Sequence, residues 1–142
     1  MHAMHDGAVL RASIITGIAY ALPIFALGFV LGVVRTLVLR AQPGWPAWAA
    51  VSMELPAMLF AAWWWLGRLA HGRHDPDYRS SALLVGLSAF FVLMTTETLL
   101  GLLVGRTLAD EGRALMTLPG ALGLLGQVAF AALPLLRAGS RP

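Results

Sequence analysis

The sequence has 142 residues, of which 58% are hydrophobic and 12% are charged, and its mean hydropathy is +0.76. Soluble domains carry about twice that share of charged residues, so the composition excludes a water-soluble globular protein and predicts an integral membrane protein. The formal charge of +3 is the balance of ten scattered arginines against seven acidic residues, and without a basic cluster it excludes nucleic acid as a partner. The lack of cysteine excludes disulfides and thiolate metal sites.

Four apolar runs of roughly twenty residues, each with at most one charge, predict four membrane-spanning helices. The runs cover about 12–39, 46–67, 81–105 and 115–136. The loops between them are too short for an aqueous domain, so we expect residues 1–142 to form a single integral membrane domain, an all-α transmembrane four-helix bundle. The N-terminal residues lack the basic start and the cleavage site of a secretory signal, so we expect the first span to be retained.

The first span carries small residues and a cation near its end. Gly28 and Gly32 form a GxxxG step, the pattern by which membrane helices approach each other closely. Arg35 follows three residues later on the same helical face. The spacing predicts that the two glycines pack against a neighbouring helix and that Arg35 points into the bundle.

The second span combines an acid, a proline and tryptophans. Glu54 lies two residues before Pro56, which removes a backbone donor and is expected to kink the helix. Tryptophans stand at both ends of the span, roughly 24 Å apart along a helix, which predicts two interfacial belts. The expected anchors are Trp45, Trp48, Trp63, Trp64 and Trp65.

The connection before the third span, residues 71–78, contains histidines and aspartates that could ligate a metal in principle. They are His71, His74, Asp75 and Asp77. Because the stretch is short, broken by proline and flanked by arginines that repel a cation, we expect a solvated turn and no metal site.

The third span holds Glu97, with Gly101 and Gly105 following at a spacing of four residues, so the acid and the glycines share one face. This face is expected to pack against another helix. Arg106 lies directly after this span. Gln127 is the only amide within a predicted span, and its expected partner is a neighbouring helix or the charged group.

The predicted depths bring the charged residues together. Glu54 and Glu97 each lie eight residues, or roughly 12 Å, from the membrane face opposite the termini, and Arg35 ends the first span near the same level. An unpaired ion at such a depth costs about 2.5–3.5 kcal/mol, so pairing or protonation is the expected remedy. We therefore predict a buried polar cluster, which is also the candidate ligand or ion site: Arg35, Glu54, Glu97, Arg106 and Gln127.

Arginine counts give an orientation. An even number of spans puts both termini on one side, and six arginines fall on that side against four on the other, which favours cytoplasmic termini in a bacterial inner membrane. The six are Arg11, Arg68, Arg73, Arg79, Arg137 and Arg141, and the four are Arg35, Arg40, Arg106 and Arg113.

The run GFVLGVVRTLVL, followed by a short Pro/Gly loop and by MELPAML, resembles a family of small, uncharacterised four-span proteobacterial membrane proteins. The resemblance covers about residues 20–136. It rests on the glycines and arginine of the first span, Glu54 with Pro56, Glu97, and Pro119 with Gly120. It implies the four-span architecture and brings no established activity.

Two functions follow from these features. The first is a structural or accessory membrane protein in which the Arg/Glu cluster fixes helix packing. The alternative is a homo-oligomeric transporter or channel for a proton, an ion or a small polar solute, which would use the same cluster and need a homodimer or larger assembly. We expect no enzyme, since no catalytic constellation is visible, and no cofactor; the expected partners are the lipid bilayer and further copies of the chain or a larger membrane complex.

Overall fold

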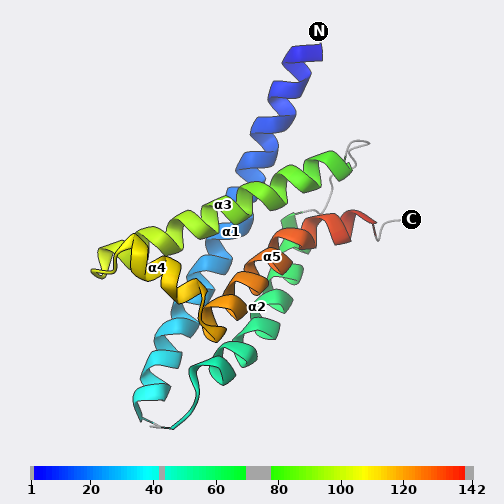
Figure 1. Cartoon of the computed structure of the whole chain (residues 1–142). Helices are drawn as coiled ribbons and strands as arrows, with labels where there is room; N and C mark the ends of the chain where they lie inside the picture. The colour runs from blue at the N-terminus through cyan, green and yellow to red at the C-terminus, as the bar shows by residue number, and fades with distance from the viewer. Residues whose placement is uncertain (1, 42–43, 70–77, 140–142) are drawn as a thin grey trace.

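The computed structural model describes residues 2–41, 44–69 and 78–139, with side chains described in 7–38, 44–69 and 81–139. These residues form five helices and no strand (Figure 1). The helices are α1 (His2–Ala41), α2 (Ala47–Leu69), α3 (Tyr78–Leu103), α4 (Leu108–Leu115) and α5 (Leu118–Gly139). The predicted all-α four-helix bundle is confirmed, because α1, α2, α3 and α5 are each long and apolar enough to cross a membrane.

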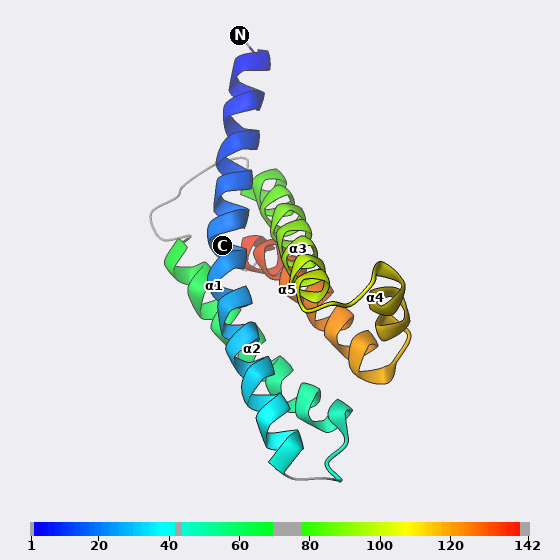
Figure 2. The same ribbon diagram turned by 90° about the vertical axis from the view of Figure 1, so that its left-hand side faces the viewer.

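Two boundaries differ from the sequence prediction. Helix α1 begins at His2 rather than near residue 12, and its first turns project beyond the other helices (Figures 1 and 2). The fourth span begins at Leu118 rather than at residue 115, because the short helix α4 occupies most of the connection after α3.

Each long helix packs against two others. Helix α1 lies on α2 and α3, and α5 also lies on α2 and α3, so α1 and α5 face each other diagonally across the bundle. Helix α4 packs on α3 and α5 alone among the described helices, at the end of the bundle away from the chain termini (Figure 2). The core is small and consists of residues that close the centre of the bundle: Tyr20, Ala21, Ile24, Ala62, Leu66, Val85, Ala89, Leu93 and Phe130.

Large apolar side chains cover the outside of the long helices, as a hydrocarbon solvent allows. Phe60 is 73% exposed, Phe91 67% and Leu125 64%, values that would be costly for such side chains in water.

Two prolines leave helical carbonyls without their usual donors, and an aromatic side chain from another helix replaces each donor. Pro23 cannot donate to the carbonyl of Ala19, and the indole nitrogen of Trp65 donates to that oxygen at 3.0 Å. Trp65 therefore differs from the interfacial anchor expected from the sequence, because it packs against the core and joins α2 to α1. In the second case Pro134 cannot donate to the carbonyl of Phe130, and the Tyr20 hydroxyl donates to that oxygen instead.

The other four tryptophans lie near the two ends of α2 and are exposed, as expected of interfacial residues. Trp45 and Trp48 are at its start. Near its end, the Arg68 guanidinium lies 4.6 Å from the Trp64 ring, and the Arg137 guanidinium lies 4.8 Å from the Trp63 ring. Pro56 lies inside α2, which continues as one helix from Ala47 to Leu69, so the predicted kink stays a prediction.

Two close contacts between spans use glycines that the sequence analysis did not single out. A methyl group at Gly17 of α1 would collide with Ser88 and with the Val85 carbonyl of α3, and one at Gly86 of α3 would collide with the carbonyl of Ala131 in α5. These two positions let α3 approach both of its partner helices closely.

The predicted packing glycines have other roles, apart from Gly28, which faces the Met58 side chain of α2. A methyl group at Gly32 would meet only the Arg35 side chain of its own helix, because Gly32 lines an open pocket. Gly101 receives the Glu111 side chain of α4, not another span. Gly105 ends α3 with φ of 88° and has open space around it, so it is a helix terminator and not a packing residue.

Candidate functional site

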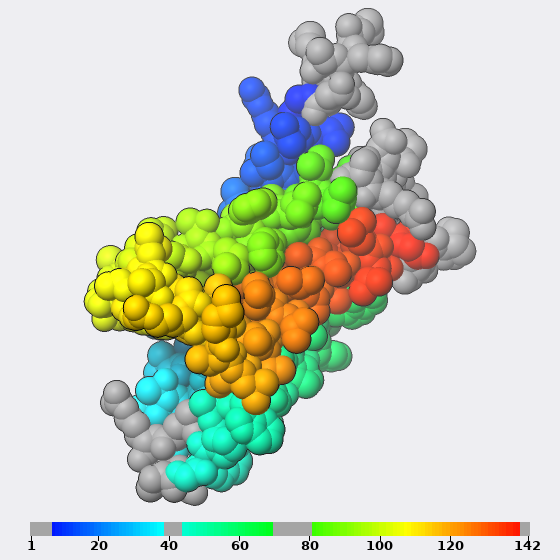
Figure 3. Space-filling view, viewed as in Figure 1, coloured from blue at the N-terminus to red at the C-terminus, as the bar shows by residue number. Residues whose placement is uncertain are grey.

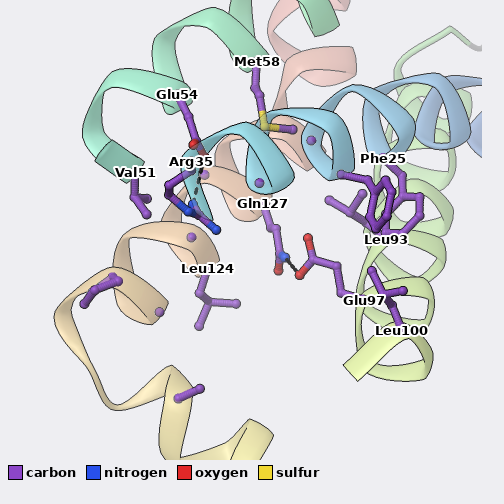
Figure 4. A pocket seen from close by; sticks show the side chains of 18 of the residues that line it. Phe25, Arg35, Val51, Glu54, Met58, Leu93, Glu97, Leu100, Leu124 and Gln127 are labelled. Atoms are coloured by element: carbon purple, nitrogen blue, oxygen red, sulfur yellow. Dashed lines mark hydrogen bonds and ion pairs between the residues drawn. The ribbon is translucent and has the colours of Figure 1, made fainter. Parts of the chain in front are cut away.

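A cavity of about 840 Å³ lies between the four spans, in the half of the bundle away from the termini (Figure 4). In Figure 3 the surface recedes between α4, in yellow, and the later turns of α1, in cyan. The cavity exists there because α4 does not pack on α1 or α2 within the described part of the chain, and because glycines of α1 and α5 line it without side chains. Those glycines are Gly28, Gly32, Gly120, Gly123 and Gly126.

One wall of the pocket holds an ion pair between α1 and α2. The Nη1 atom of Arg35 donates to Oε2 of Glu54 at 2.8 Å, and the side chains are 32% and 18% exposed. Glu54 is seven residues from the start of α2, roughly 10 Å along the helix, so the pair is well inside the span. Arg35 is therefore the counter-charge of Glu54, and the ion pair links α1 to α2.

The other wall holds a neutral amide and an acid. Nε2 of Gln127 on α5 donates a short hydrogen bond to Oε2 of Glu97 on α3. The amide oxygen of Gln127, Oε1, is buried and accepts no hydrogen bond from the part of the chain that the structure describes. Glu97 therefore has an amide partner, and no arginine pairs with it among the residues described. Figure 4 shows both polar pairs facing the pocket.

Arg106 does not join the other charged residues. Its Nε atom lies 3.2 Å from Oε1 of Glu111, an acid of α4 that the sequence analysis left outside the cluster. Glu111 rests against Gly101, and both Arg106 and Glu111 line the end of the pocket. The five residues predicted to converge therefore form two pairs on facing walls and a third pair with Glu111 at one end.

Helix α4 is placed by its own capping box. Thr107 accepts a hydrogen bond from the backbone of Asp110, and the Asp110 carboxylate accepts one from the backbone of Thr107. The hydrogen bonds from the Thr107 side chain and backbone hold the pKa of Asp110 below its usual value. Arg113 pairs with Asp110 one turn on, at 3.1 Å. The order Thr-x-x-Asp is the sequence signal that could have predicted this helix.

The pocket is rich in hydrogen-bond acceptors and carries a negative balance. Two arginines and three glutamates line it, and most of the remaining wall is apolar. No group of three or more metal-ligating side chains occurs in the described ranges. The loop residues considered for a metal, His71, His74, Asp75 and Asp77, lie outside the described residues. The arrangement can hold a polar or cationic group beside apolar surface.

Comparisons with protein-family models, with curated proteins and with solved structures give no match for this chain. The family resemblance inferred from the glycine, arginine and glutamate pattern stays a prediction, and the function has to be argued from the pocket itself.

Proposed function

We propose that this multi-pass membrane protein binds a small amphipathic molecule in the pocket between its spans. The observation that carries the proposal is the single cavity of about 840 Å³ that Arg35, Glu54, Glu97 and Gln127 all line. Ligand pockets have volumes of about 300–1,000 Å³, mostly apolar walls and a few converging polar groups. The cavity has each of these properties.

The polar residues divide between a packing role and a binding role. The Arg35–Glu54 pair is complete in itself and links neighbouring helices, which is what the structural or accessory function requires. Glu97 and Gln127 fit that function less well, because an acid without a counter-charge and an amide oxygen without a donor weaken a membrane helix bundle unless something binds them. Their position in the pocket wall supports ligand binding.

The pocket suggests a transporter or a receptor-like binding protein rather than a complete channel. It occupies the half of the bundle away from the termini, and the described core closes the centre through residues such as Tyr20 and Phe130. A path through the membrane would then need rearrangement of the helices or a second copy of the chain. With cytoplasmic termini in an inner membrane, the pocket would receive its solute from the periplasmic half.

Site-directed labelling tests the proposal directly, because the chain has no cysteine of its own. Gly123 lines the pocket and has open space around it, so Gly123→Cys introduces a thiol without a collision. Leu125, two residues along α5, is 64% exposed on the outside of the bundle and provides the matched control. Maleimides react with thiolates, which form only where water reaches the sulfur.

We expect a membrane-impermeant maleimide to label Gly123→Cys in vesicles and to leave Leu125→Cys, which faces lipid, largely unlabelled. Labelling from one side only would also give the orientation. Equal and negligible labelling of both variants, in protein shown to be folded, would mean that the pocket is closed to water and that the structural or accessory function is the better one.

A further inference from the structure

We propose that the pocket selects a cationic amphiphile, a small apolar molecule that carries one protonated amine, and that Glu97 is its counter-charge. This proposal rests on the proposed function and adds the chemical class of the ligand. The apolar part would lie along the pocket wall, and the ammonium group would lie beside the hydrogen-bonded pair of Glu97 and Gln127.

The charges of the pocket favour a cation. Arg35 is paired with Glu54, and Arg106 lies beside Glu111, so both arginines that line the pocket have an acid next to them. One carboxylate remains, that of Glu97. An incoming cation would complete the balance, whereas an anion would meet an uncompensated negative charge in a medium of low dielectric constant.

The hydrogen-bonding groups favour a donor with several N–H bonds. Oε1 of Gln127 is buried and accepts no hydrogen bond within the described residues, whereas Oε1 of Glu111 lies 3.2 Å from Nε of Arg106 and is paired with it. Glu111 rests against Gly101, which lies one helical turn from Glu97 on the same face of α3, so the two carboxylates are neighbours. An ammonium group has three donors and no acceptor, which matches the amide oxygen of Gln127 and the carboxylate of Glu97.

The remainder of the wall specifies an apolar body for the ligand. Leu55, Leu59, Leu93, Leu100 and Phe130 line the same cavity. A free inorganic cation would leave this surface and most of the volume unfilled. An amine attached to an apolar group would occupy both parts of the pocket.

The test uses two fluorescent probes of similar shape, one with a protonated amine and one in which acetylation removes the charge and two of the three N–H donors. Dansylcadaverine has an aliphatic primary amine that is protonated at neutral pH, and its N-acetyl derivative is neutral and of similar shape. Binding is measured by dansyl fluorescence with the full chain in lipid nanodiscs, and empty nanodiscs correct for partition into lipid. Glu97→Gln removes the counter-charge. Asp110→Asn removes an acid from the same end of the protein that does not line the pocket, and is the matched control.

The wild type should bind the amine at least about tenfold more tightly than the acetyl probe, the usual advantage of a charged hydrogen bond. Glu97→Gln should abolish this preference and keep the acetyl probe's affinity, and Asp110→Asn should retain it. If Glu97→Gln does not give folded protein, Gln127→Met removes the second acceptor and should also reduce the preference. An unchanged preference in the variant measured would overturn the proposal.

Two further outcomes separate this proposal from the proposed function. Equal affinity of the wild type for the two probes would overturn the cationic ligand and leave the binding pocket intact. Gly123→Phe should fill the pocket and weaken the binding of both probes. If Gly123→Phe changes the affinity for neither probe, the probes do not bind in the pocket. The proposed function then fails together with this proposal.

Discussion

Tyr20 of α1 donates its hydroxyl proton to the carbonyl oxygen of Phe130 in α5, at 3.1 Å, and stacks on the Phe130 ring with the centroids 4.3 Å apart. The acceptor is the carbonyl that Pro134 leaves without a helical donor. One residue therefore both links two diagonal helices and satisfies a backbone group that would otherwise be buried without a partner. Trp65 does the same for the carbonyl of Ala19, which Pro23 leaves without a donor.

Removal of the Tyr20 hydroxyl should destabilise the bundle only while Pro134 is present. Tyr20→Phe keeps the stacked ring and should cost about 0.6–1 kcal/mol in unfolding free energy, measured by denaturant titration in detergent micelles. In the Pro134→Ala background a backbone N–H again reaches Phe130, so Tyr20→Phe should cost much less. An equal cost in both backgrounds would show that the hydroxyl does not replace the missing helical bond.

Gly86 should tolerate no side chain, because a methyl group there would enter the space of the Ala131 carbonyl in α5. Gly86→Ala should lower the unfolding free energy by roughly 1–3 kcal/mol, the cost of overpacking against a backbone that cannot move aside. Gly123→Ala is the control, since nothing lies within 4 Å of an added methyl group there and alanine favours the helix. The contact would be unimportant if the two variants were equally stable.

Substitution of Arg35 alone should destabilise the protein more than substitution of both Arg35 and Glu54. Arg35→Gln leaves Glu54 inside the span without a counter-charge and should cost on the order of 2 kcal/mol, somewhat less than for a fully buried pair because both side chains are partly exposed. The double variant Arg35→Gln/Glu54→Gln has no uncompensated charge and should be the more stable of the two. Thermal unfolding in nanodiscs gives the comparison, and a double variant less stable than the single one would contradict this argument.

The four spans could be predicted from the sequence because insertion of a helix into a bilayer depends on its hydropathy and length, which are local properties. A contact between Arg35 and an acid could be anticipated from depth alone, but depth could not decide between Glu54 and Glu97, which lie at the same level. Helix partners could not be assigned in this way. The GxxxG step at Gly28 and Gly32 suggested a helix contact, yet α3 approaches α1 and α5 at Gly17 and Gly86, because the crossing point of two helices depends on their angles and not on a local motif.

The roles of Trp65 and Tyr20 also lay beyond the sequence prediction. A tryptophan triplet next to an arginine is typical of an interface, and nothing local indicates that one indole points inward to a carbonyl in α1. The prolines were the available signal, because each one in a span frees the carbonyl four residues before it and predicts that a donor must approach. The polar residues of the pocket were named from the sequence, but its volume and shape could not be, because they depend on the separation of α4 from α1 and α2, a tertiary property.

Helix α4 should respond to acid through Asp110, which caps its first turn. Because hydrogen bonds from Thr107 lower the pKa of Asp110 in the folded state, its contribution is fully present above the unfolded pKa, about 4, and is lost as the pH falls through the folded value. Amide hydrogen exchange in residues 108–115, corrected for the intrinsic pH dependence of exchange, should therefore show weaker protection below about pH 4. Asp110→Ala should reduce the protection at neutral pH and remove most of its dependence on acid, while α2 should keep its protection in both proteins. Protection of α4 that stays constant from neutral pH to pH 3 in the wild type would mean that the Asp110 cap does not stabilise the first turn of this helix.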